Sequence, residues 1–127
     1  MKSKSITTKD APQPAGHYSQ AVVYNNLVFI SGQLPIDPST GERLTGEIEQ
    51  QARQVFKNVE AILRASESSL ANLLKVTIYL PDISLWDKVN KVYTEFLGES
   101  KPARSVVPTR DLHYGVKIEV EAIAATE

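Results

Sequence analysis

The spacing of apolar residues changes along this chain, from every second residue in some segments to every third or fourth in others. Residues 20–24 and 27–31 are rich in β-forming side chains and flank Asn25 and Asn26. Asparagine tolerates the positive φ angles of a two-residue turn, so the pattern predicts a β-hairpin. Further strands are predicted at 73–80, 104–109 and 116–125, with an additional short one near 5–7.

Two segments show the spacing of amphipathic helices. Between residues 47 and 65, apolar side chains recur every three or four positions and define one helical face. A second helix is predicted to end at Gly98, because glycine readily adopts the conformation that terminates helices. Ser84 is expected to cap its N-terminus, with Asp87 three residues later as in a capping box. Extended or turn-rich loops are expected at 10–16 and 35–46.

The order of these elements, β-β-α-β-α-β-β, predicts one α+β domain over residues 1–127, with two helices on one face of a single sheet. Residues 22–30 and 116–124 carry apolar side chains on both alternations of the strand. Neither face of these strands is therefore expected to meet water. We expect the second face of the sheet to be buried against other copies of the chain.

Composition excludes several classes of function. The net charge is −1, from 14 basic and 15 acidic residues, so no overall field attracts nucleic acid. The chain has no cysteine, which excludes disulfides, thiolate catalysis and thiolate-bound metals. Its two histidines, His17 and His113, fit no metal-binding motif, and we expect no metal site. No apolar run suits a membrane span or a secretory signal, so a cytoplasmic protein is expected.

Two charged residues are candidates for chemistry. Arg104 begins a predicted strand, and a guanidinium there can hold a carboxylate through two parallel hydrogen bonds. Glu119 lies in the last, largely apolar strand, where a carboxylate on a buried side needs an explanation. The residue types alone leave open that both are solvated surface charges.

Five short segments follow one another in order along nearly the whole chain. They are AGHYSQA at 15–21, ISGQL at 30–34, NKVY at 90–93, PARS at 102–105 and VKIEVEAIA at 116–124. Together they resemble the reactive-intermediate (imine) deaminase family, RidA/YjgF. The resemblance implies a chorismate-mutase-like α+β fold. It also implies a homotrimer with three clefts between subunits.

The resemblance further implies an activity. Family members typically hydrolyse 2-imino acids, such as 2-iminobutanoate and 2-iminopropanoate, to 2-keto acids and ammonia, without metal or organic cofactor. This removes reactive products of pyridoxal-phosphate enzymes. Arg104 matches the arginine that binds the substrate carboxylate, and Glu119 matches the acidic residue beside the attacking water. A general base there would need a raised pKa, which burial would supply.

Other positions match the walls of the family's cleft. They are Tyr18, reaching in from the neighbouring subunit, together with Ser31, Gly32, Asn90 and Val106. Structural alternatives stay open for three of them. Tyr18 would serve equally as a packed loop aromatic, Gly32 as the site of a β-bulge and Asn90 as a structural hydrogen bonder.

The chain also departs from the family pattern. His17 replaces a proline, Val106 replaces a cysteine, and residues 112–115 replace a leucine-proline turn, which leaves substrate range and rate open. Two other functions remain as alternatives. One is a module that binds 2-keto or other small carboxylic acids without turnover, and the other is RNA cleavage or inhibition of translation.

Overall fold

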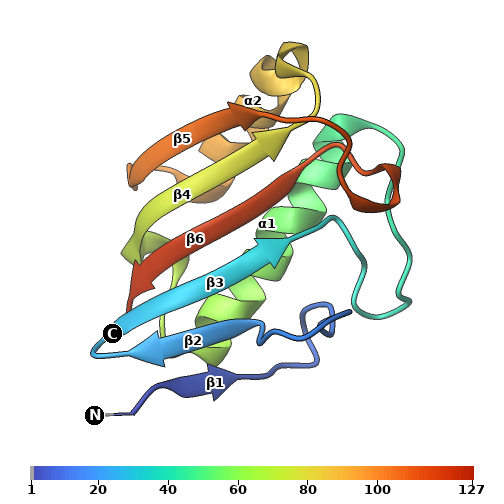
Figure 1. Ribbon diagram of the computed structural model, residues 1–127. Coiled ribbons are helices and arrows are strands. Elements are labelled where there is room, and N and C mark those ends of the chain that lie inside the picture. The colour runs from blue at the N-terminus through green and yellow to red at the C-terminus, as the bar shows by residue number, and fades with distance from the viewer. Residues whose placement is uncertain (1) are drawn as a thin grey trace.

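A computed structural model describes residues 2–127, which form one six-stranded sheet with two helices on one face (Figure 1). The strands are β1 (Lys4–Ile6), β2 (Ala21–Tyr24), β3 (Leu27–Gln33), β4 (Leu73–Leu80), β5 (Ala103–Pro108) and β6 (Glu119–Ala125). The helices are α1 (Ile48–Ala65) and α2 (Trp86–Leu97), with short 3-10 turns η1 (Leu70–Asn72), η2 (Ile83–Leu85) and η3 (His113–Gly115). The predicted α+β architecture is confirmed. None of the helices within residues 2–127 has the length and apolar character to cross a membrane.

The strands lie in the order β1-β2-β3-β6-β4-β5. β6, the last strand in the chain, occupies the middle of the sheet and pairs antiparallel with both β3 and β4. The pair β4 and β5 is parallel and is connected by α2. This arrangement leaves β1 and β5 as the two edges of the sheet.

The hairpin of β2 and β3 is confirmed. Asn25 and Asn26 have φ angles of 55° and 68°, as a two-residue turn between right-twisted strands requires. Tyr24 pairs directly with Leu27 across this turn. The short N-terminal strand is confirmed as well, with Ser5 paired to Val22.

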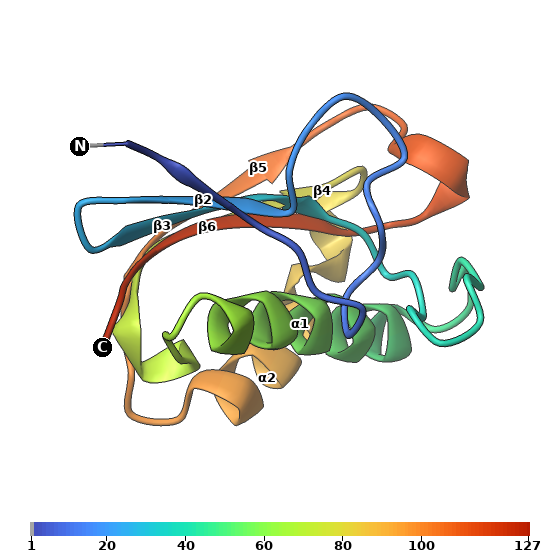
Figure 2. The same cartoon turned by 90° about the horizontal axis from the view of Figure 1, so that it is seen from below.

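The core lies between the sheet and α1 and α2, which cover the same face (Figure 2). Helix α1 contributes the predicted apolar face, and its fully buried residues include Ala52, Val55, Ile62 and Leu63. The inward side chains of the central strands meet them, among them Val28, Ile78, Val120 and Ala124. Burial of each large aliphatic side chain stabilises the fold by about 1.5–3 kcal/mol.

The opposite face of the sheet carries large apolar side chains that the single chain exposes. Tyr24, Leu27 and Phe29 are 42%, 36% and 42% exposed. Phe29 pairs with Ile123 of β6, so this apolar surface continues across the middle of the sheet. An apolar surface of this kind is typical of a protein interface.

Two predicted element ends were wrong. Ser84 does not cap α2, because the turn η2 runs directly into the helix and Leu85 occupies the capping position without a side-chain bond. Instead, Asp82 Oδ1 accepts the backbone N–H of Ser84 at 2.9 Å. The last strand begins at Glu119 rather than at 116, because the Val116 N–H closes η3 by donating to the His113 carbonyl. Gly98 does end α2, with φ 57° and its N–H bonded to the Thr94 carbonyl.

Three connections gather at the end of the sheet away from the two termini (Figures 1 and 2). They are the segment before β2, the segment after β3 and the segment between β5 and β6. The first of these arches over the face that the helices leave uncovered (Figure 2). This end of the molecule holds the candidate site.

Candidate functional site

A cavity of about 450 Å³ opens where these connections meet. Four of the predicted site residues line it: Tyr18, Ser31, Gly32 and Glu119. The rest of its wall combines apolar and aromatic side chains with three glutamines: Pro12, Leu34, Ile36, His113 and Tyr114, and Gln13, Gln20 and Gln33. The volume falls within the range of about 300–1,000 Å³ that is usual for small-molecule sites.

Glu119 is the first residue of β6 and is half-buried in this cavity. Burial is the main cause that raises the pKa of its carboxyl, and the neighbouring Glu121 raises it further, while His113 acts in the opposite direction. A carboxylate with a raised pKa is a stronger base than an ordinary surface glutamate. Arg104 is not among the charges that act on Glu119 in the single chain.

Gly32 provides the room for this carboxylate. A Cβ atom on Gly32 would lie 2.1 Å from Glu119 Oε2, well inside any permitted contact. The pairing of β3 with β6 also changes register between Ile30 and Gln33, so Gly32 sits in a β-bulge, the structural alternative for this position. The β-bulge and the lack of a side chain on Gly32 therefore act together, because both leave space for the Glu119 carboxylate.

Ser31 attaches the arching loop to β3. Its hydroxyl donates to the Ser19 carbonyl at 2.6 Å, and its N–H donates to the Gln20 carbonyl at 3.0 Å. Tyr18 lies next to this anchor and remains 51% exposed. Its hydroxyl accepts a long 3.4 Å bond from the Ala15 N–H. A packed loop aromatic does not describe this ring, which is available to a substrate or to another subunit.

Gln20 is a residue that the sequence analysis missed. Its buried side-chain amide donates to the carbonyls of Thr8 and Pro12, both at 2.9 Å, and accepts the Thr8 N–H at 2.7 Å. These bonds hold the proline-rich loop above the cavity. The sequence signal for this role was a polar side chain directly before a β-strand. Burial of such a polar group is costly unless it is hydrogen-bonded.

Arg104 lies on the edge strand β5 and packs against α2. Its guanidinium carbon is 4.5 Å from the centre of the Trp86 ring and 5.1 Å from that of Tyr93. Its Nη1 donates to Asn90 Oδ1 at 3.3 Å. The three helix residues share one face because they are spaced by four and three positions. The sequence analysis singled out Asn90 but missed Trp86 and Tyr93.

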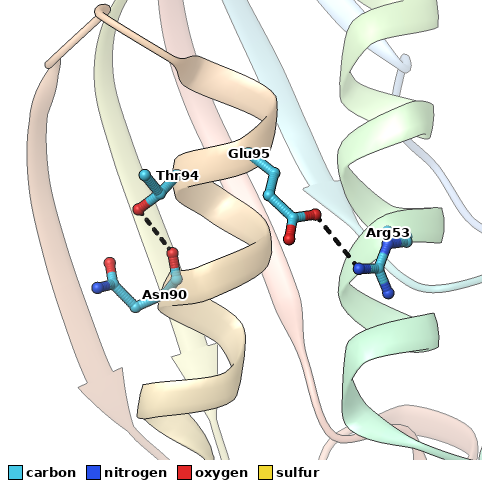
Figure 3. Close-up of polar contacts among 4 residues, drawn as sticks. All are labelled: Arg53, Asn90, Thr94 and Glu95. Atoms are coloured by element: carbon cyan, nitrogen blue, oxygen red, sulfur yellow. Dashed lines mark hydrogen bonds and ion pairs between the residues drawn. The ribbon is translucent and has the colours of Figure 1, made fainter.

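Helix α2 is itself held in place on its other side. Figure 3 shows the ion pair of Arg53 on α1 with Glu95 on α2, at 3.2 Å. Thr94 Oγ1 donates to the Asn90 carbonyl at 2.8 Å, and the Asn90 side chain points away from α1 (Figure 3). Asn90 is therefore free to bond with Arg104 across the gap to β5.

Within one chain, Arg104 and Glu119 do not meet. Arg104 pairs with Val76 of β4, and Glu119 pairs with Tyr79 of the same strand. Residues 76 and 79 are an odd number of positions apart, so their side chains point to opposite faces of the sheet. Val106 lies two positions beyond Arg104, on the same face as the arginine. The predicted site is thus divided into a cavity around Glu119 and a surface around Arg104.

The departures from the family pattern fall in different places. His17 is exposed and does not line the cavity, whereas His113 and Tyr114 of the replaced turn do. Val106 is partly buried and packs against the core. The turn before β6 is therefore the one of these three segments that contributes side chains to the cavity wall.

Known proteins resemble this chain over nearly its full length. Residues 8–126 match the family model described as Endoribonuclease L-PSP. A RutC family protein of Pyrococcus horikoshii is 52% identical over 122 residues, covering 96% of this chain and 97% of the relative. The human 2-iminobutanoate/2-iminopropanoate deaminase is 38% identical over 119 residues, covering 94% of this chain and 87% of the relative.

A crystal structure from Thermotoga maritima superimposes with a TM-score of 0.95 at 45% identity, covering 100% of this chain and 99% of that one. The resemblance derived from the five sequence segments is confirmed by these matches. The chain belongs to the Endoribonuclease L-PSP family, the family of the RutC and Rid proteins.

Proposed function

We propose that this protein hydrolyses small 2-imino acids to 2-keto acids and ammonia. The observation that carries the proposal is Glu119, a carboxylate whose pKa is raised by burial in a cavity of ligand size. Arg104, which lies on β5 and packs against α2, adds a group suited to binding the substrate's own carboxylate. The name of the human relative, an imine deaminase, agrees with this chemistry.

We propose further that the active site forms between copies of the chain, in a homotrimer. Two features support this assembly. The uncovered sheet face is apolar around Leu27 and Phe29, and none of the six residues of β5 is buried in the single chain. Joining the Arg104 surface of one copy to the Glu119 cavity of the next would complete the site.

Light scattering should give a trimer, and Phe29→Asp should dissociate it with loss of activity; a fully active monomer would contradict this assembly.

The proposed reaction begins with the substrate carboxylate held by Arg104. Charged hydrogen bonds of this kind contribute roughly 1.5–3 kcal/mol each, and they place the imine carbon near the base. A water oxygen bonds to that carbon while one water proton passes to Glu119, and Glu119 then gives this proton to the imine nitrogen, which yields a neutral tetrahedral amino alcohol. The tetrahedral intermediate then loses its C–N bond, and the electron pair leaves with the nitrogen.

The remaining steps conserve all atoms. Glu119, again a carboxylate, takes the hydroxyl proton of the intermediate and delivers it to the departing nitrogen, so the hydroxyl oxygen becomes the carbonyl of the 2-keto acid and ammonia leaves. Tyr18 and Ser31 supply hydroxyl groups at the cavity wall that can orient the water or the substrate. The reaction consumes water and requires no redox partner.

The test is a competition for the imine. An L-amino-acid oxidase generates 2-iminobutanoate, and semicarbazide captures whatever the protein leaves. The wild type should lower semicarbazone formation, and Arg104→Ala should abolish that effect without changing oligomer mass. Arg64→Ala is the matched control, because Arg64 is an exposed arginine whose ion pair with Glu60 lies within α1. Undiminished turnover in a stable Arg104→Ala protein would refute the proposal.

Two alternatives predict other outcomes. A module that senses small carboxylic acids would bind a 2-keto acid, keep that affinity in Glu119→Gln and accelerate no imine loss. A ribonuclease would bind RNA in a salt-dependent manner. The net charge of −1 argues against such binding.

A further inference from the structure

We propose that the turn η3 makes this site selective for 2-imino acids with aromatic side chains, with Tyr114 packing against the substrate ring. The inference rests on the proposed deaminase function and names the substrate class of the same site. It concerns the turn His113–Gly115, two of whose residues, His113 and Tyr114, line the cavity around Glu119.

The first observation is the backbone of Tyr114. Its φ and ψ angles are 62° and 17°, in the left-handed region that bulky residues rarely occupy. Such a conformation costs of order 1 kcal/mol or more unless its surroundings impose it. Here Gly115 follows with φ 73°, which allows the tight turn, and the Arg43 guanidinium carbon lies 3.6 Å from the centre of the Tyr114 ring.

The second observation is what this conformation achieves. Tyr114 is not buried by it, since 41% of the residue remains exposed. The ring instead lines the cavity that contains Glu119. Core packing therefore does not explain why a tyrosine is held in a costly conformation at this position. Besides the Arg43 contact, packing against a molecule in the cavity would account for it.

The third observation is that Tyr114 is part of an aromatic wall. The rings of His113 and Tyr114 lie 5.8 Å apart, centre to centre, and are inclined by 50°. Tyr18 lines the same cavity from the loop before β2. Aromatic rings prefer such offset or edge contacts at 4.5–7 Å, and each pair contributes about 0.5–1.5 kcal/mol beyond burial of area.

The fourth observation is the space beside the base. Leu34 and Ile36 continue the wall with apolar side chains. A cavity of about 450 Å³ is of the size that holds drug-like ligands, whereas 2-iminobutanoate has only four carbons. The carboxylate of Glu119 thus marks the reacting end, and the aromatic wall suits a phenyl or indole group on the same substrate.

The experiment compares two imines made by an L-amino-acid oxidase, 2-imino-3-phenylpropanoate from phenylalanine and 2-iminopropanoate from alanine. The wild type should hydrolyse the phenyl imine with the higher kcat/KM. Tyr114→Asn removes the ring but keeps a residue that tolerates the left-handed region. It should lower the ratio of the two kcat/KM values about threefold to tenfold. Tyr114→Phe, the matched control, should keep the wild-type ratio.

Binding of the two products gives a second readout that does not depend on turnover. By calorimetry, 3-phenylpyruvate should bind the wild type more tightly than pyruvate, and Tyr114→Asn should remove the difference. An unchanged ratio and unchanged product affinities in Tyr114→Asn would overturn the inference while leaving the deaminase intact. Ring-dependent binding without hydrolysis of either imine would overturn the proposed function and leave the aromatic specificity standing.

Discussion

The surroundings of Arg104 and Glu119 differ in almost every physical respect. Arg104 is exposed, and its guanidinium is oriented by two aromatic rings and an asparagine on α2. Glu119 is half-buried, and its carboxylate occupies the space left by a glycine in a β-bulge. The arginine is thus oriented by its neighbours while it stays exposed, and the glutamate is partly withdrawn from water.

This difference matches the separate tasks that we assign to the two groups. A substrate-binding cation must keep its full charge and a fixed direction. A general base works best when its pKa approaches the working pH, which burial provides and a nearby guanidinium would prevent. Within one chain, the placement of the two groups on opposite faces of the sheet keeps the Arg104 guanidinium from lowering the pKa of Glu119.

The largest expected effect is from Glu119→Gln. Loss of a general base should reduce kcat/KM by about a hundredfold to ten-thousandfold. In the wild type, kcat/KM should fall as the pH drops through the raised pKa of Glu119, because protonation removes the base. A pH–rate profile should show this acidic limb in the wild type and lack it in Glu119→Gln. The same limb in both proteins would assign the titration to another group.

Mixing subunits would test whether the two regions act across a subunit boundary. Arg104→Ala and Glu119→Gln are each expected to be nearly inactive. Unfolded together in equal amounts and refolded, they should regain activity at about a quarter of the sites, because random pairing gives each cleft one intact Arg104 and one intact Glu119 with that frequency. No recovery in correctly assembled trimers would mean that both groups act within one chain.

Gly32→Ala would test the room left for the base. The added Cβ would lie 2.1 Å from Glu119 Oε2, so the carboxylate must move. Displacement of a catalytic group by about 1 Å is expected to lower kcat by about tenfold to a hundredfold. Gly46→Ala is the matched control, since its Cβ would meet nothing closer than Gln50 at 3.9 Å. Equal kinetics in the two variants would show that the position of Glu119 is not critical.

Trp86→Leu should have the smallest effect. It removes one of the two rings beside Arg104 and leaves Tyr93 and Asn90 in place. A cation–π contact at an exposed site is worth about 0.5–1 kcal/mol, so we expect KM to rise about twofold to fivefold with kcat unchanged. Trp86→Phe should retain most of the affinity. A fall in kcat at constant KM would assign Trp86 a role other than orienting the arginine.

Most of the fold was predictable because its determinants are local. The turn at Asn25 and Asn26, the apolar face of α1 and the end of α2 at Gly98 each follow from neighbouring residues. Ser84 failed as a cap for a local reason too. The turn η2 continues directly into α2, and the residue that caps η2 is Asp82, whose side chain accepts the Ser84 N–H.

The site was less predictable because it depends on segments far apart in the chain. The family motifs marked Arg104 and Glu119, but the sequence could not show that they face opposite sides of the sheet. The contact of Trp86 and Tyr93 with Arg104 depends on how α2 packs beside β5. The position of Tyr114 in the cavity wall depends on its left-handed backbone conformation. Neither produces a periodic pattern.

The central position of β6 has a consequence for how the chain folds. β1, β2 and β3 form one antiparallel unit, β4 and β5 form another, and β6 alone joins them through hydrogen bonds on both of its sides. The ribosome therefore delivers the strand that unites the sheet after every other strand has been made. Until residues 119–125 emerge, β3 and β4 present unpaired edges, which are templates for aggregation. Folding must be completed by contacts that span most of the chain, which is intrinsically slow.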